Sequence, residues 1–131
     1  MFLDASAIIA IIARETEGAA LAARLGRAVD VYTSPIALYE AVLGLARVGR
    51  SSIGDAELVL GAFLEELGAH IIPISVEIGR SAIVAFDRFG RGRHAAALNM
   101  GDCFAYACAR SLNLPILFKG EDFPQTDIAI A

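Results

Sequence analysis

Short runs of apolar and β-branched residues recur along the chain, and most end at a polar residue or a proline, as the strands of a buried sheet do. The runs that predict strands are Phe2–Leu3, Val29–Thr33, His70–Ile74, Pro115–Phe118 and, as a last strand, Asp127–Ile130. Pro73 cannot donate a backbone hydrogen bond, so it belongs at the end or the edge of its strand.

Between these runs lie longer segments in which apolar residues recur at the spacing of a helix. The expected helices are Ser6–Ala13, Glu15–Gly26, Pro35–Val48, Gly54–Leu67, Val76–Phe86 and Gly101–Leu112. Strands that alternate with helical crossovers predict an α/β fold of three layers, in which a parallel central sheet has helices on both faces.

At 131 residues the chain is most simply a single domain, residues 1–131, that is long enough to bury one core. Its hydrophobic fraction of 56% is high, but the longest uncharged apolar run, Ala5–Ala13, is too short to span a bilayer. The opening residues Met1–Asp4 lack the positive charge of a secretory signal. We therefore expect a cytoplasmic protein without a membrane partner, in which Cys103 and Cys108 are buried thiols.

The net charge of −4, from 11 basic and 15 acidic residues, argues against a nonspecific nucleic-acid-binding protein. That argument fails if four carboxylates form a metal site, because 11 acids then remain against 11 bases. Four acids do stand beside or within apolar elements: Asp4, Glu40, Asp102 and Asp122. Asp4 and Asp122 follow apolar strands, and Asp102 begins an apolar helix. Glu40 is the only charged residue between Pro35 and Arg47.

Each of these acids also has a local explanation. Asp4 and Asp102 could be helix N-caps. Asp122 could shape a turn, and Glu40 could form a buried salt bridge. Together, however, they can meet, because ligands of a parallel sheet bind outside the carboxyl ends of its strands. Converging carboxylates repel one another unless a cation intervenes, and oxygen ligands favour Mg²⁺ or Mn²⁺. Such an ion typically activates water for attack on a phosphodiester.

The segments that carry these acids resemble the four motifs of the PIN-domain ribonucleases, and within them of the VapC-type toxins of toxin–antitoxin pairs. They are MFLDAS at residues 1–6, SPIALYE at 34–40, GDCFAYA at 101–107 and KGEDF at 119–123. The resemblance implies a PIN-like fold and an acidic tetrad for Mg²⁺ or Mn²⁺ made of Asp4, Glu40, Asp102 and Asp122. It also implies that Ser6 assists near Asp4, although Ser6 could instead cap a helix. Glu121 could replace Asp122 as a ligand, but the position before Phe123 favours Asp122.

By the same resemblance we expect a metal-dependent endoribonuclease, the toxin of such a pair, which hydrolyses RNA phosphodiester bonds with metal-activated water. The implied partners are a VapB-type antitoxin, an RNA substrate and a second copy of the chain in a homodimer. Apolar faces of the helices at residues 17–26 and 35–48 could form part of the dimer or antitoxin surface.

RNA binding needs positive charge, since phosphate contacts dominate its affinity. The candidate contact residues are Arg88, Arg91 and Arg93, near His94 in an expected loop, and Lys119 beside the fourth motif. The arginines could instead belong to a merely solvated loop, and Lys119 could pair with Glu121.

Two other classes of protein are alternatives to an endoribonuclease. A phosphoacceptor receiver domain needs paired acids after the first strand, but Asp4 is followed by Ala5. A noncatalytic interaction protein with the PIN fold would have no need of an intact acidic tetrad, so the tetrad favours the enzyme.

Overall fold

A computed structural model describes residues 1–131, and its centre is a sheet of four short parallel strands. The strands are β1 (Phe2–Leu3), β2 (Tyr32–Thr33), β3 (His70–Ile71) and β4 (Ile116–Leu117), in the order β3-β2-β1-β4. The helices are α1 (Ala5–Ile12), α2 (Gly18–Leu25), α3 (Pro35–Gly49), α4 (Ile53–Leu67), α5 (Val76–Phe89) and α6 (Met100–Ser111), with a short 3-10 helix η1 (Phe123–Gln125). The predicted α/β class is confirmed.

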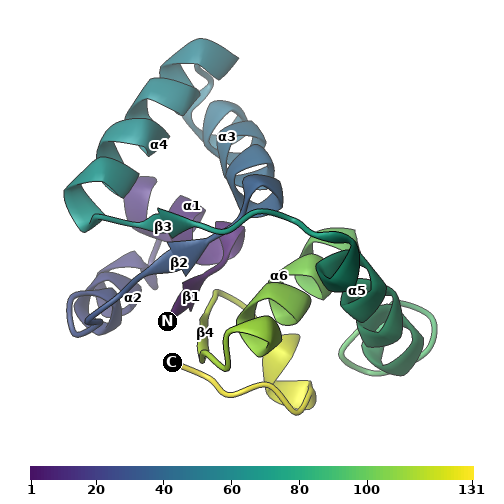
Figure 1. The fold of residues 1–131 in the computed structure, drawn as a ribbon. Coiled ribbons are helices and arrows are strands. Elements are labelled where there is room, and N and C mark those ends of the chain that lie inside the picture. Colours follow the sequence, from purple (N-terminus) through teal and green to yellow (C-terminus); the bar gives the residue numbers. More distant parts are fainter.

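Neighbouring residues of β1 and β4 point to opposite faces of the sheet and build two separate cores. Phe2 and Ile116 are fully buried against α5 and α6. Leu3 and Leu117 are buried among α1, α2, α3 and α4. The three layers are visible in Figure 1, where α5 and α6 lie on one side of the strands and the other helices on the opposite side.

Three of the predicted strands, those at residues 29–33, 70–74 and 115–118, are shorter in the structure, and the last predicted strand is absent. Val29 is 97% exposed, because pairing with the neighbouring strands begins only where Val31 accepts a hydrogen bond from His70. The segment at 127–130 makes a single bridge, from Ile130 to Ile116, and forms no strand. The start of this segment is held in a turn, in which the N–H of Ile128 donates to the hydroxyl of Thr126. The prediction of a last strand was therefore wrong.

Helix boundaries differ where tertiary contacts outweigh the local signals. The predicted second helix starts three residues late, at Gly18, because Glu15 is still bonded to the end of α1 through Ala10. The fifth helix continues to Phe89, whose ring is buried beneath α6. In the expected loop after Phe118, residues Phe123–Gln125 form η1, anchored by the buried ring of Phe123.

Both cysteines are free and buried in α6, as the sequence predicts. None of the helices combines the length and the apolar character that a membrane crossing requires.

Candidate metal centre

Asp4 lies where β1 ends and α1 begins, and it is only 4% exposed. Its backbone N–H donates to Leu117 of β4, which fixes the residue at the carboxyl edge of the sheet. Its side chain caps α1 and accepts hydrogen bonds from the N–H of Ser6 at 2.9 Å and from the hydroxyl of Ser6 at 2.5 Å. Burial nevertheless raises the pKa of Asp4, and the bonds from Ser6 only partly oppose it. The expected N-cap exists, at a site where a negative charge is costly.

Glu40 projects from the second turn of α3, a helix that begins where Ser34 caps it and Pro35 occupies its first turn. Its carboxylate rests against α6 at Gly101, where both carboxylate oxygens lie 2.2 Å from the position that a Cβ atom would take. Burial, followed by the charges of Asp4 and Asp102, raises its pKa to about 7. Glu40 forms no ion pair, so the buried salt bridge that could have explained it is absent.

Asp102 is the third residue of α6, and Asn99 is the cap of that helix. Each side chain accepts a bond from the backbone of the other residue: the backbone N–H of Asp102 donates to the side-chain oxygen of Asn99 at 2.9 Å, and the backbone N–H of Asn99 donates to the Asp102 carboxylate at 2.8 Å. The reading of Asp102 as the N-cap was therefore wrong by three residues. Burial raises its pKa to about 6, the bond from Asn99 opposes this, and the charges of Asp4 and Asp122 add to it.

Asp122 is exposed and immediately precedes η1. Its side chain makes no capping hydrogen bond, and only its backbone carbonyl takes part in the turn, accepting from Gln125. Its charge is felt at Asp102, whereas no such effect involves the neighbouring Glu121. These observations favour Asp122 over Glu121 as the fourth member of the site.

The charges of the four acids thus act on one another, although no three of the side chains are arranged so that they could hold a metal ion as they stand. No lysine or arginine forms an ion pair with any of them. Carboxylates that repel one another and offer only oxygen donors fit a hard divalent cation. The donor chemistry suits Mg²⁺ or Mn²⁺.

Comparison with known proteins decides the family. A profile described as PIN domain matches residues 1–129. The chain belongs to the PIN-domain family. VapC ribonuclease R02377 of Rhizobium meliloti (strain 1021) is 37% identical to it, over 97% of this chain and 98% of that protein. Ribonuclease VapC of Mycolicibacterium smegmatis is also 37% identical, over 98% of both chains.

A solved structure supports the fold of this PIN domain. Mycobacterium tuberculosis VapC20, described as a toxin that cleaves the sarcin–ricin loop, superposes with a TM-score of 0.77. The alignment covers 99% of this chain and 97% of that one at 16% identity, so the likeness concerns architecture.

Ser6 joins the first and fourth motif segments of the PIN domain. Its hydroxyl donates to Asp4 and accepts a hydrogen bond of 2.9 Å from the backbone N–H of Lys119. The alternative of a helix cap was wrong for Ser6, because Asp4 caps that helix. The hydroxyl instead fixes the orientation of the Asp4 carboxylate relative to the loop that carries Asp122.

The ammonium group of Lys119 lies between two acids, at 2.5 Å from Glu15 and 3.5 Å from Glu17. Glu121, the other partner that the sequence suggested for Lys119, forms no ion pair with it. Because the Lys119 side chain is partly exposed, this ion pair is worth little and can give way to a phosphate.

The candidate RNA-contacting arginines differ in their surroundings. Arg88 pairs with Asp127 at 3.0 Å, and Arg93 pairs with Asp87 at 2.9 Å. Arg91 forms no ion pair, and its charge slightly opposes the rise in the pKa of Asp102. Of the three arginines, Arg91 is therefore both unpaired and close enough to influence Asp102.

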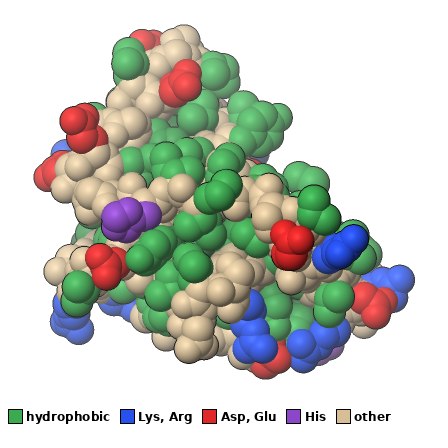
Figure 2. All heavy atoms as spheres, viewed as in Figure 1, with side chains coloured by type: hydrophobic (Ala, Val, Ile, Leu, Met, Phe, Trp, Pro, Cys, Tyr) green, Lys and Arg blue, Asp and Glu red, His purple; other side chains and the backbone are tan.

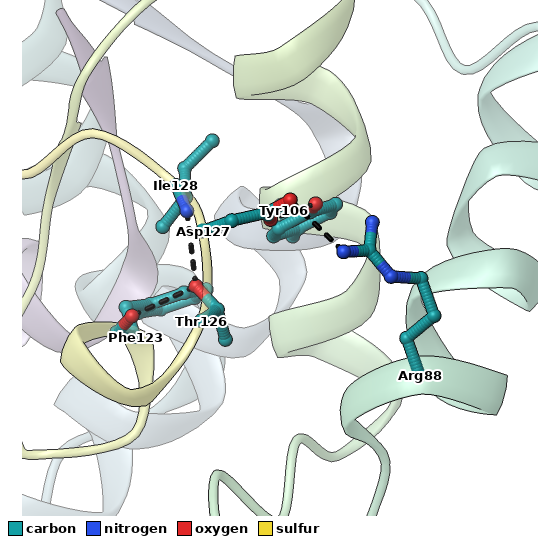
Figure 3. Close-up of polar contacts among 6 residues, drawn as sticks. All are labelled: Arg88, Tyr106, Phe123, Thr126, Asp127 and Ile128. Carbon is teal, nitrogen blue, oxygen red and sulfur yellow. Dashed lines mark hydrogen bonds and ion pairs between the residues drawn. The ribbon is translucent and has the colours of Figure 1, made fainter.

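Figure 3 shows the polar contacts around Arg88 and Asp127. Asp127 lies between Arg88 of α5 and the hydroxyl of Tyr106 of α6, which donates to the same carboxylate at 2.5 Å. These bonds lower the pKa of Asp127. The cluster fastens the segment after η1 onto both helices, which gives Arg88 a structural partner.

We expect Tyr106→Phe to lower the free energy of unfolding by about 1 kcal/mol, since it removes a hydrogen bond to a charged acceptor at a partly exposed site. Urea unfolding at pH 7 measures this change. RNA cleavage should stay at the wild-type level, because Tyr106 bonds to Asp127 and to none of the four acids. Unchanged stability would mean that the cluster does not hold the C-terminal segment.

Sequence reasoning missed two residues of this site, Asn99 and Gly101. Asn99 could have been found, because a cap residue followed three positions later by an acid is a capping-box pattern. Gly101 had no local signal, since its importance depends on Glu40 in another helix.

Proposed function

We propose that this chain is a divalent-metal-dependent endoribonuclease that acts as the toxin of a toxin–antitoxin pair. The observation that carries the proposal is the placement of the Glu40 carboxylate against Gly101, next to Asp102, where the charges of Asp4, Glu40 and Asp102 act on one another without any basic partner. The relatives named VapC ribonuclease, which match nearly the whole chain, supply the class of substrate.

In the proposed mechanism, a divalent cation, Mg²⁺ or Mn²⁺, would supply the activation of water and the stabilisation of charge at phosphorus. Asp4, held rigidly by Ser6 and by β4, gives the site a fixed anchor. Asp102 has a fixed position through its reciprocal bonds with Asn99. Glu40 is held against Gly101, whereas the exposed Asp122, whose side chain makes no capping hydrogen bond, has freedom to adjust around a bound phosphodiester.

The proposal is tested with the purified chain, free of antitoxin, and a structured RNA. Cleavage should require Mg²⁺ or Mn²⁺ and stop when EDTA is added, and it should resume when the metal is restored. Cleavage that continues unchanged in excess EDTA would overturn the metal-dependent mechanism. Absence of cleavage in all RNA classes, with the metal bound, would favour the noncatalytic alternative.

Arg91 is the proposed main phosphate contact beside the acidic group. Figure 2 shows basic side chains on the part of the surface around α5, whereas the surface over α3 and α4 is mostly hydrophobic and acidic. The roles of Arg88, Arg93 and Lys119 are secondary in this proposal, because each already contacts a carboxylate.

We expect Arg91→Ala to weaken RNA binding several-fold and to reduce the slope of log K against log salt by about 1. Arg80→Ala is the matched control, since Arg80 is exposed at the other end of α5 and forms no ion pair. Fluorescence anisotropy with an RNA in an EDTA buffer measures both variants. Equal salt slopes for the two would place the phosphate contact elsewhere.

The proposed partners are a VapB-type antitoxin and a second copy of the chain, and the proposed location is the cytoplasm. Side chains of α3 support a partner surface, since Tyr39 is 65% exposed and Leu43 42% exposed beside an open groove of about 500 Å³ between α3 and α4. The molar mass from light scattering, with and without the antitoxin, tests the homodimer.

A further inference from the structure

The candidate metal centre contains a close approach between α3 and α6, at a residue that has no side chain of its own. At Gly101, the second residue of α6, the carboxylate of Glu40 fills the space into which any other residue would project its Cβ atom. That atom would lie 2.2 Å from both carboxylate oxygens and 2.4 Å from the carbon between them. Ordinary contacts of a Cβ atom begin near 3.4 Å, so the carboxylate and a side chain at position 101 exclude each other.

The chain contains a similar capping pattern twice, which isolates the effect of Glu40. The cap and first turn of α4 are Ser52-Ile53-Gly54-Asp55, and those of α6 are Asn99-Met100-Gly101-Asp102. In both, the cap bonds to the third helical residue, an aspartate. The nearest atom to a Cβ at Gly54 is the hydroxyl of Ser52, at 3.9 Å. A Cβ atom would therefore fit at Gly54, so the capping pattern itself does not require a glycine. What distinguishes Gly101 from Gly54 is the Glu40 carboxylate beside it.

We infer that Gly101 is a positioning residue, whose missing side chain lets α6 receive the Glu40 carboxylate beside Asp102 and Asp4. This inference rests on the proposed metal-dependent function. With an alanine at position 101, the flexible end of Glu40 yields before the helix backbone does. The carboxylate is then displaced from the group of acids, while the two buried cores, which do not include Gly101, remain packed.

The test is the affinity of the purified chain for Mn²⁺ alone, measured by isothermal titration calorimetry. Gly101→Ala should weaken Mn²⁺ binding by about 10- to 100-fold, as loss of a support for a metal ligand typically does. Gly54→Ala, the matched control, changes the same position of the same local motif and should bind as the wild type does. Equal binding by Gly101→Ala and the wild type would overturn the inference.

A second background shows whether the effect passes through Glu40. In a Glu40→Gln chain, which already lacks the carboxylate, adding Gly101→Ala should cause no further loss of Mn²⁺ affinity. A further loss there would mean that alanine acts by moving α6 or Asp102, and it would overturn the inference. If Gly101→Ala alone fails to fold, adding Glu40→Ala, which removes the long side chain, should restore the circular dichroism spectrum of the wild type. A double variant that still fails to fold would also overturn the inference.

The wild type separates this inference from the proposed function. If the wild type binds no Mn²⁺, the metal-dependent function falls, and the role of Gly101 falls with it. If the wild type binds Mn²⁺ and loses it in Glu40→Gln, but Gly101→Ala has no effect, the function stands and only the positioning role is wrong.

Discussion

Replacing Asp4 or Asp102 with asparagine should lower RNA cleavage at least about 100-fold, because each change would remove a negative ligand from the proposed metal, which would supply several kcal/mol to the transition state. The fold should persist, because an asparagine oxygen can still accept the bonds that Asp4 takes from Ser6 and that Asp102 takes from Asn99. Cleavage of a labelled RNA under single-turnover conditions measures the loss.

Asp55→Asn is the matched control for Asp102→Asn. Asp55 occupies the same third position of a capped helix and bonds in a similar way to its cap, Ser52, but it lies exposed on α4. Its variant should cleave RNA at the wild-type rate. A chain that carries both Asp4→Asn and Asp102→Asn and still cleaves would show that the assignment of the metal centre is wrong.

Without a divalent cation, the protein should lose stability as the pH rises from 5 to 8. The folded-state pKa of Glu40 is about 7 against an ordinary value of 4.5, and that of Asp102 is about 6 against 3.8. A carboxyl group with a raised pKa in the folded state penalises folding once it ionises. The penalty is therefore absent at pH values below the ordinary pKa values and complete above about pH 7.

We expect this loss to reach roughly 2 kcal/mol, a figure already reduced because both side chains are partly exposed. The melting temperature should accordingly fall by roughly 5 °C or more between pH 5 and pH 8 in EDTA. Millimolar Mg²⁺ or Mn²⁺ should restore most of the difference at pH 8, since a ligand that binds only the folded state stabilises it.

A variant identifies the source of this pH dependence. Glu40→Gln removes one titrating group, so its melting temperature in EDTA should be higher than that of the wild type at pH 8 and similar to it at pH 5. Were the variant and the wild type to show the same pH profile, the carboxylates would not be the cause, and the coupling between Glu40, Asp4 and Asp102 would be refuted.

The layers of this fold follow from the pattern of the sequence. Pairs such as Phe2 and Leu3 are apolar on both faces of a strand, which requires helices above and below the sheet. Strand propensity gave the wrong prediction at Val29 and at residues 127–130, because a segment forms a strand only where a neighbouring strand offers hydrogen bonds. At the C-terminus, the turn at Thr126 and the bonds of Asp127 to Tyr106 and Arg88 take the place of a ladder.

The sequence by itself determined which acids are out of place, because a lone charge such as Glu40 in an apolar helix is visible without any structure. Only the tertiary structure decided what each one contacts. The segments at 52–55 and 99–102 have nearly the same local pattern, yet Asp55 is exposed and Asp102 is half-buried. The difference is the packing of α3 against α6, which brings Glu40 onto Gly101. Local hydrogen bonds form both caps, but repulsion between distant carboxylates arises only where the fold brings their segments together.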